Sequence, residues 1–157
     1  GATTRSYIQR EDANQVSKIK IGDDIIHRMG DVGYFDDEGR LWYCGRKSHQ
    51  VTTKDAVLFT EQIENIFNAH PQVFRTALVG VDGEPVLWVE LNSRHPKSLK
   101  TSDVLDELKA LATAHPQASQ IRTFLFLKKF PTDVRHNSKI IREKLASLAT
   151  RKSITKN

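Results

Sequence analysis

Residues 73–91 read VFRTALVGVDGEPVLWVEL, two apolar runs on either side of a short polar turn. The run from Val73 to Val81 is rich in β-branched residues, which favour strands because their side chains pack well on a pleated surface. The Asp-Gly pair at 82–83 is typical of a tight turn, since glycine adopts positive φ without strain. A partner strand is expected from Val86 to Leu91. This stretch therefore predicts a strand hairpin on which helices can pack.

A helix is expected before this hairpin, over residues 60–69. Ile63, Ile66 and Phe67 fall at the i, i+3, i+4 spacing of one buried helical face. Thr60 is suited to cap the first turn, because its hydroxyl can accept a hydrogen bond from a free backbone N–H. The helix would then lead into the first strand of the hairpin.

Three more elements are expected after the hairpin. They are a helix over residues 102–115, a strand over 123–127 and a terminal helix over 139–149. Each helix carries one apolar stripe, and the residues of the two stripes are Val104, Leu105, Leu108, Leu111 and Ala112, then Ile140, Ile141 and Leu145. Smaller hairpins are expected over residues 30–46 and around Lys54. This order predicts an α+β fold with helices packed on a short mixed sheet, preceded by β-hairpin strands.

The composition is that of an ordinary globular chain. Of its 157 residues, 38% are hydrophobic and 27% charged, and no apolar run approaches the roughly 20 residues of a membrane span. The length favours one domain with a strip of a second. The first residues lack the apolar core of a signal peptide, and Cys44 is the only cysteine, so no internal disulfide can form. We therefore expect a cytoplasmic protein without a membrane span.

Positive charge is concentrated toward the C-terminus. Residues 128–157 hold nine Lys or Arg residues against Asp133 and Glu143, whereas the whole chain carries a net charge of +5. Such a segment could attract phosphate, nucleic acid or an acidic partner. The alternative is a solvated helix face with a frayed tail. Charge alone leaves both interpretations open.

Three polar segments carry the residues best suited to chemistry. They read HRMGDVGYF at residues 27–35, GRLWYCGR at 39–46 and FPTDVRHNSKIIR at 130–142. Together they resemble the adenylate-forming superfamily of acyl-CoA synthetases, luciferases and peptide-synthetase adenylation domains. In that family a Gly-Asp element, a Gly-Arg element and a late lysine occur in this order. The resemblance covers essentially the whole chain, including the segment from Glu61 to Pro71.

The resemblance implies that Asp31 and Arg46 bind ATP or AMP. A carboxylate at Asp31 can accept two hydrogen bonds from neighbouring ribose hydroxyls. The planar guanidinium of Arg46 suits ribose hydroxyls or a phosphate. The alternatives are a turn cap for Asp31 and a surface position at a strand end for Arg46. In the family this arginine also precedes the interdomain hinge, which places the expected hinge at Lys47 and Ser48.

Lys139 is the expected catalytic residue. Attack of a carboxylate on the α-phosphate of ATP creates negative charge on the phosphate oxygens, which a lysine can stabilise. Its expected place at a helix start also fits a nearby anion, because helix N-termini favour negative charge. The alternative is an ordinary surface lysine. Arg135, His136 and Asn137 are expected to support it, with His136 either ordering the loop or acting as an acid or base.

Departures from the common family pattern indicate a subtype. The late lysine usually follows a glycine but here follows Ser138, and Ser48 replaces the usual Asp or Lys at the hinge. The segment from Asp133 to Ile140 resembles the late motif of the β-lactone synthetases of olefin biosynthesis. Those enzymes adenylate a β-hydroxy fatty acid, whose hydroxyl then displaces AMP to close a four-membered lactone. The implied substrate is a carboxylic acid, and a coenzyme A thioester is the alternative product.

Family members carry a Ser/Thr/Gly-rich phosphate loop in a large N-terminal domain, and no such loop occurs in these 157 residues. We therefore interpret residues 1–47 as the last strands of that domain and residues 48–157 as a mobile C-terminal lid. The rest of the N-terminal domain would be its partner, and other enzymes of the pathway could also bind it. The six histidines are scattered, so no set has metal-ligand spacing. ATP and Mg²⁺ would be held mainly outside this chain, which alone should be inactive.

A basic module that binds nucleic acid is an interpretation from a different class. It explains the charge of residues 128–157 but not the order of the Gly-Asp, Gly-Arg and Ser-Lys elements. The chain has three tyrosines and two tryptophans, and no recognised nucleic-acid signature places them among the basic residues. Trp42 and Trp88 are expected to pack in a core rather than to stack on bases. We therefore expect no nucleic-acid partner.

Overall fold

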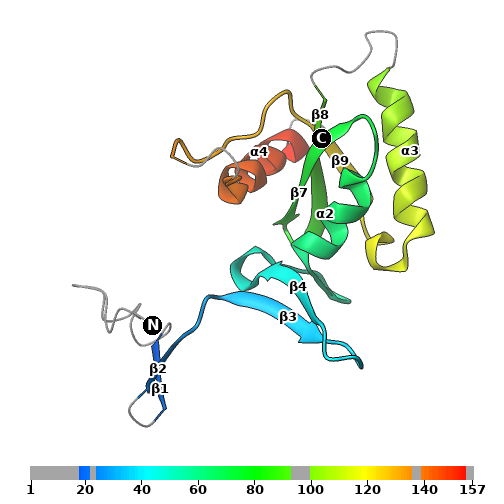
Figure 1. Ribbon diagram of the computed structural model, residues 1–157. Coiled ribbons are helices and arrows are strands. Elements are labelled where there is room, and N and C mark those ends of the chain that lie inside the picture. The colour runs from blue at the N-terminus through cyan, green and yellow to red at the C-terminus, as the bar shows by residue number, and fades with distance from the viewer. Residues whose placement is uncertain (1–17, 22–23, 93–99, 136–138, 155–157) are drawn as a thin grey trace. The chain divides into compact units, whose positions relative to one another are not determined.

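The computed structural model describes residues 18–21, 24–92, 100–135 and 139–154. The chain divides into two compact units, with the boundary after Ser48. Figure 1 labels most of the longer strands and helices in both units. Within the described ranges, no helix combines the length and apolar character needed to cross a membrane.

The described part of the first unit contains two antiparallel strand pairs. Strand β1 (Lys18–Ile21) pairs with β2 (Asp24–His27), and β3 (Asp31–Phe35) pairs with β4 (Leu41–Arg46). The second pair confirms the hairpin expected over residues 30–46. A short polar turn therefore brings the Gly-Asp and Gly-Arg segments onto neighbouring strands.

A three-stranded mixed sheet forms the centre of the second unit. Strands β7 (Val73–Val81) and β8 (Glu84–Leu91) are antiparallel, and β9 (Thr123–Phe126) lies parallel to β8, so the order is β7-β8-β9. Asp82 and Gly83 join β7 to β8 with φ values of 51° and 80°. Two consecutive positive φ angles are what a tight two-residue hairpin turn requires. The predicted central hairpin and mixed sheet are confirmed.

Helices cover both faces of this sheet. The other elements that the structure describes are the short strand pair β5 (Val51–Thr52) and β6 (Val57–Leu58), the helices α2 (Thr60–Asn68), α3 (Thr101–Ala114) and α4 (Arg142–Ile154), and the 3-10 turns η1 (Lys47–His49) and η2 (Pro116–Ala118). Figure 1 shows α4 on one face of the sheet and α2 and α3 on the other. Along β8, Leu87 and Val89 pack into the core beneath α2 and α3, whereas Val86 and Trp88 pack into the core beneath α4. The period-two alternation of a strand thus places one core on each face.

The last helix begins later than the sequence predicted. It starts at Arg142 rather than at Lys139, and it extends to Ile154. The backbone of Thr132 forms an antiparallel bridge with Ile140, which keeps the residues before the helix extended. Local pairing of the loop therefore overrides the helical pattern at residues 139–141, and the prediction that Lys139 opens the helix is wrong.

The predicted cap of helix α2 is also wrong. Thr60 is the first helical residue and is buried, whereas Phe59 takes the cap position with an extended backbone and no side-chain hydrogen bond to the helix. Burial of Thr60 against the core decides its position, so its hydroxyl is not used as a cap. Helix α3 behaves as predicted, since Val104 and Leu108 are fully buried on its apolar stripe.

The two tryptophans have opposite environments. Trp88 is fully buried on β8, and its indole Nε1–H donates a hydrogen bond to the Leu145 carbonyl of α4 at 3.0 Å. Trp42 on β4 is 50% exposed, so the prediction of a core position is confirmed for Trp88 and wrong for Trp42. Tyr34 stacks on Trp42, with ring centres 6.5 Å apart. The β3–β4 hairpin therefore presents aromatic side chains at its surface.

Candidate functional site

The two residues expected to bind nucleotide face each other across strands β3 and β4. Asp31 is the register partner of Arg46, and Arg46 Nη1 lies 3.0 Å from Asp31 Oδ1. The two side chains are 35% and 45% exposed, so a ligand outside the strand pair can reach both. Asp31 Oδ2 has no hydrogen bond to any residue that the structure describes, which leaves an acceptor for a hydroxyl group.

A bulge in β4 creates this pairing. Gly33 pairs with Tyr43, but Val32 pairs with Gly45, so Cys44 is an extra residue on one strand. An extra residue of this kind shifts the strand register by one and changes the face of the strand pair to which the following side chains point. Gly45 has φ of 111°, a conformation that residues with a Cβ rarely adopt. The Gly-Arg element therefore supplies a glycine because the bulge needs one.

Further hydrogen bonds hold the two strand ends together. Arg46 Nη1 also donates to the carbonyl of Met29, and the N–H of Lys47 donates to the carbonyl of Gly30 at 2.8 Å. The Gly-Asp segment is thus bonded to the Gly-Arg segment through both backbone and side chain. Lys47 and Ser48, the expected hinge, are exposed and lie in the 3-10 turn η1.

Asp36 organises the opposite end of this hairpin. Its Oδ1 accepts the backbone N–H groups of Glu38 and Arg40, and its Oδ2 accepts Trp42 Nε1–H and Arg40 Nε–H, both at 2.7 Å. The indole N–H of Trp42, and then the side-chain and backbone donors of Arg40, hold the pKa of Asp36 below its usual value. This network fixes the turn that joins β3 to β4.

Lys139 lies in a loop whose two sides bond to each other. The N–H of Asp133 donates to the Lys139 carbonyl, and the N–H of Ile141 donates to the Pro131 carbonyl, both at 2.9 Å. The Lys139 side chain is exposed and makes no ion pair or hydrogen bond with a described residue. Its backbone is therefore fixed while its ammonium group remains available to a ligand.

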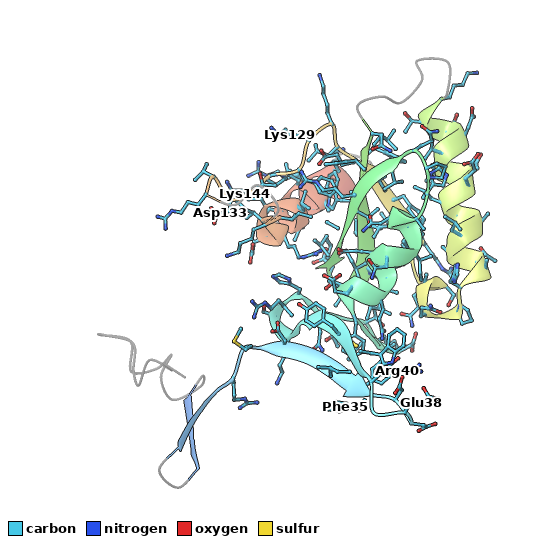
Figure 2. All side chains as sticks on the ribbon, viewed as in Figure 1. Phe35, Glu38, Arg40, Lys129, Asp133 and Lys144 are labelled. Carbon is cyan, nitrogen blue, oxygen red and sulfur yellow. The ribbon has the colours of Figure 1, made fainter. Side chains whose placement is uncertain are left out.

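The expected supporting residues are only partly within the described chain. Arg135 is exposed, and its backbone N–H donates to Asp133 Oδ1 at 2.8 Å. His136, Asn137 and Ser138 lie outside the described residues. Figure 2 shows Asp133 on the loop beside α4. Asp31 and Arg46 belong to the first unit, whereas Lys139 belongs to the second.

Two ion pairs with buried carboxylates in the second unit were not predicted from the sequence. Arg142, the first residue of α4, donates two hydrogen bonds to Glu64 of α2, and Arg75 of β7 donates to Glu90 of β8. Burial raises the pKa of Glu64, and the hydrogen bonds from Arg142 oppose that effect. The sequence feature that could have indicated these pairs is a charged residue inside an otherwise apolar helix face or strand, because a buried charge requires a partner.

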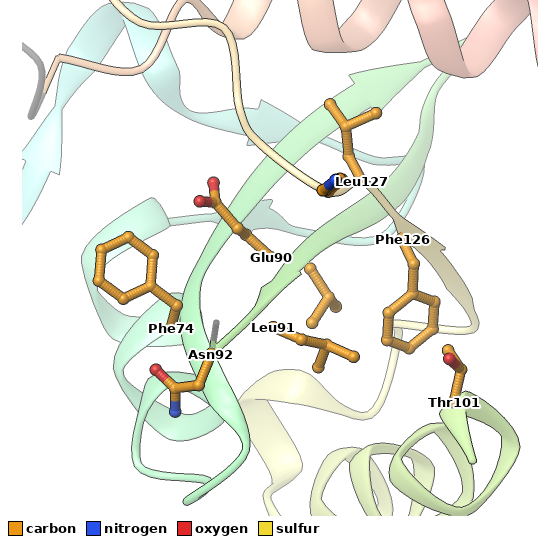
Figure 3. Close-up of a pocket in the computed structure, with 9 residues that line it drawn as sticks. Phe74, Glu90, Leu91, Asn92, Thr101, Phe126 and Leu127 are labelled. Atoms are coloured by element: carbon orange, nitrogen blue, oxygen red, sulfur yellow. The ribbon is translucent and has the colours of Figure 1, made fainter. Parts of the chain in front are cut away.

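A cleft of about 540 Å³ lies beside strands β8 and β9, and Figure 3 shows its lining. Phe74, Leu91 and Phe126 supply apolar surface, and Asn92 and Thr101 supply polar groups. None of the residues expected to bind nucleotide lines this cleft. Among the described residues, no three His, Cys, Asp or Glu side chains gather to form a site for a metal ion.

Curated proteins with similar sequences point to one family, although no protein-family model matches the chain. The chain is 48% identical, over 97% of its length, to an olefin beta-lactone synthetase of Xanthomonas campestris pv. campestris, and 46% identical, over 94%, to one of Stenotrophomonas maltophilia. It is 32% identical over 68% of its length to a 4-chlorobenzoate–CoA ligase of Arthrobacter. The chain spans 29%, 28% and 20% of these three proteins, respectively.

Solved structures share the fold. The chain matches an O-succinylbenzoate coenzyme A synthetase of Bacillus subtilis in complex with AMP with a TM-score of 0.69 and 23% identity, over 90% of this chain and 27% of that one. An anthranilate CoA ligase in complex with anthranoyl-AMP gives a TM-score of 0.72 and 20% identity, with the same coverage. Identity this low supports the fold alone. The sequence relatives and the order of the motifs, together with this shared fold, show that the chain belongs to the adenylate-forming superfamily and represents its C-terminal region.

Proposed function

We propose that the chain is part of a longer AMP-forming ligase that activates a β-hydroxy fatty acid and closes it to a β-lactone. The observation that carries this proposal is 48% identity over 97% of the chain to a relative named olefin beta-lactone synthetase. Identity to a relative named as a CoA ligase is 32% over 68% of the chain. The greater similarity over a greater length favours the lactone subtype.

The first reaction would be adenylation. A carboxylate oxygen attacks the α-phosphorus of ATP, the bond between the α-phosphorus and the bridging oxygen breaks, and pyrophosphate leaves. Negative charge grows on the oxygens around the α-phosphorus, and Lys139 is the group that would stabilise it. The ammonium group of Lys139 is exposed and bonds to none of the described residues, which supports this role. Asp31 and Arg46 would hold the ribose and orient the nucleotide.

The second reaction would be ring closure. The β-hydroxyl oxygen attacks the acyl carbonyl carbon, its proton passes to solvent or a base, and AMP leaves with the electrons of the acyl–oxygen bond. This step needs no thiol. Arg135, His136 and Asn137 are the chain's candidates for support of the site, since they precede Lys139 in the same loop.

The two units would play different parts in these reactions. Residues 1–47 would complete a large nucleotide-binding domain, and residues 48–157 would act as a lid that turns about Lys47 and Ser48. The division into compact units after Ser48 supports this interpretation. So does the exposed 3-10 turn at the same place, because hinges are commonly a few residues between elements.

Mg²⁺ would accompany ATP rather than reside in this chain. The described residues gather no set of carboxylates or histidines for a metal, so the phosphates and residues outside the chain would hold it. When bound, it would neutralise phosphate charge. We further expect the chain to work with the remainder of its N-terminal domain, to act beside other enzymes of the same pathway and to lie in the cytoplasm.

A second candidate is an acyl-CoA ligase. Similarity to a 2-succinylbenzoate–CoA ligase of Bacillus cytotoxicus, 37% identical over 52% of the chain, favours it. The adenylation step would be the same, and a coenzyme A thiol would replace the β-hydroxyl as the attacking group. A nucleic-acid-binding module has no such support.

Product analysis of the longer enzyme separates these functions. The purified enzyme receives ATP, Mg²⁺ and a β-hydroxy fatty acid without coenzyme A. We expect AMP and β-lactone in equal amounts. Formation of AMP only after addition of coenzyme A, together with a thioester, would replace the lactone proposal with the ligase. Failure to release pyrophosphate with any carboxylic acid would contradict both.

A further inference from the structure

The loop that carries Lys139 begins at a buried carboxylate. The N–H of Phe130 donates to Glu90 Oε2 at 2.8 Å, and the same oxygen lies 2.9 Å from Arg75 Nε and from Arg75 Nη2. The Glu90 side chain is 9% exposed, and Figure 3 shows it directed to a different side of β8 from Leu91. The Arg75 guanidinium also lies 5.3 Å from the centre of the Phe130 ring. Phe130 is therefore held by both its backbone and its ring.

The same loop ends at a second buried carboxylate. Arg142 Nη1 donates to Glu64 Oε1 at 2.5 Å, and Arg142 Nη2 donates to Glu64 Oε2 at 3.0 Å, a two-point bond. Glu64 Oε1 also accepts the N–H of Leu78, whose carbonyl accepts Arg142 Nη1. The side chains of Arg142 and Glu64 are 14% and 8% exposed. This contact joins α2, β7 and the first residue of α4.

Between these two anchors the loop pairs with itself. Thr132 bridges to Ile140, and the N–H of Asp133 donates to the carbonyl of Lys139. The Lys139 backbone therefore has a position set by a small hairpin whose two ends are tied to the central sheet. A displacement at either end would be passed to Lys139, because its own side chain has no described contact that would hold it.

Stability alone gives a weak reason for two buried ion pairs at these positions. Removing charges from water costs about as much as their attraction returns, so well-packed apolar residues often serve stability equally well. A two-point arginine–carboxylate bond does, however, fix direction as well as distance. One pair lies at each end of the loop, Arg75–Glu90 where it leaves the sheet and Glu64–Arg142 where it enters α4, so both can set the direction of the chain that carries Lys139.

We propose that Glu90 and Glu64 are positioning residues, which hold the two ends of the 130–142 loop so that Lys139 reaches the α-phosphate in the adenylation step. This inference rests on the proposed function, because it requires Lys139 to act in that step. The carboxylates act through the loop and need not touch ATP or the acid.

The test is a set of double-mutant cycles in the longer enzyme. Glu64→Gln and Glu90→Gln are each made alone and together with Lys139→Ala, and adenylation is followed by pyrophosphate release. Misplacement of a catalytic group costs on the order of 10- to 100-fold, so we expect each single variant to lower kcat in that range with little change in KM for ATP. In the Lys139→Ala background, we expect neither variant to slow the reaction more than about twofold.

Glu107→Gln is the matched control, since Glu107 of α3 lies 2.6 Å from His70, in the segment between α2 and β7 and away from the 130–142 loop. It removes a carboxylate from the same domain, and kcat should stay near that of the parent enzyme. Arg142→Lys is a second variant for the case in which Glu64→Gln does not fold, because it keeps the charge and loses the two-point bond. Amide hydrogen exchange at Asp133 and Ile141 should become faster in Glu64→Gln and in Arg142→Lys, and it should stay unchanged in Glu107→Gln.

The outcomes separate the two claims. If Glu64→Gln and Glu90→Gln lower kcat by the same factor in the wild-type and Lys139→Ala backgrounds, the positioning proposal is overturned. The carboxylates would then act independently of Lys139. Loss of kcat in Glu107→Gln as well would show a general effect of destabilisation and would overturn it too. Wild-type adenylation by Lys139→Ala would instead contradict the proposed function of that lysine.

Discussion

Arg46 stands opposite Asp31, with Nη1 and Oδ1 3.0 Å apart, because Cys44 is an extra residue in strand β4. Without the bulge, continuation of the pairing between Gly33 and Tyr43 would bring Gly45 opposite Asp31. Successive side chains of a strand point to opposite faces, so Arg46 would also change sides. The pairing of the two nucleotide-binding candidates therefore depends on this bulge, in which Gly45 adopts a φ of 111°.

Gly45→Ala should break this link. The φ of 111° at Gly45 is unfavourable for alanine, and strain of this kind costs about 1–3 kcal/mol. We expect a lower melting temperature and a higher KM for ATP in pyrophosphate release. Gly39→Ala is the control, because Gly39 also has positive φ (75°) but lies in the turn. It should lower stability and leave the KM unchanged; an equal change of KM in both variants would contradict the role of the bulge.

The fold was predictable where the hydrophobic pattern was strong. A strand that helices cover on both faces is apolar throughout, and this pattern allowed β8 to be predicted as a strand. Its buried residues are Val86, Leu87, Trp88 and Val89. The start of α4 was not predictable in this way. Ile140 fits a helical stripe equally well, and only its pairing with Thr132 across the loop decides against the helix.

Pairing between distant residues was the other limit. Asp31 and Arg46 were recognised singly, but the ion pair between them depends on a one-residue shift in register that periodicity does not reveal. The bond between Glu64 and Arg142 joins two helices far apart in the sequence. A single sequence shows that such charges need partners and does not show which partners they have.

The two tryptophans give a matched pair for stability. Trp88→Phe removes a buried hydrogen bond to the Leu145 carbonyl and leaves a small void, so we expect a loss of about 1–3 kcal/mol in the free energy of unfolding. Trp42→Phe, at the surface of the hairpin, should cost less. Urea unfolding measures both. Equal losses would contradict the assignment of Trp88 to the core.

Asp36 should titrate below its usual pKa of 3.8. A carboxyl group with a lowered pKa in the folded state stabilises that state above the unfolded value, and this contribution is lost as the pH falls through the lowered pKa. The β3–β4 turn should therefore loosen only at a pH below 3.8. Trp42→Phe removes the largest cause, so it should raise the pKa, as carbon NMR of the Asp36 carboxyl can measure. A pKa unchanged by that substitution would contradict the role of the indole.

The 157 residues alone should not turn over ATP. They contain no Ser/Thr/Gly-rich phosphate loop, and they span 29% of the Xanthomonas relative. We expect no pyrophosphate release above background when the isolated chain receives ATP, Mg²⁺ and a β-hydroxy fatty acid. The longer enzyme in the same assay is the positive control. Substantial turnover by the isolated chain would contradict the prediction that residues outside it are needed to bind ATP.

The most direct measurement compares the two half-reactions of the longer enzyme before and after Lys139→Ala. One assay follows pyrophosphate release from ATP and the acid, and the other follows the fate of acyl-adenylate supplied ready-made. If Lys139 stabilises the charge that develops at the α-phosphate, the substitution should slow adenylation by on the order of 100-fold or more and leave consumption of the acyl-adenylate close to wild type. Unchanged adenylation in the variant, or equal slowing of both half-reactions, would contradict the assignment of Lys139.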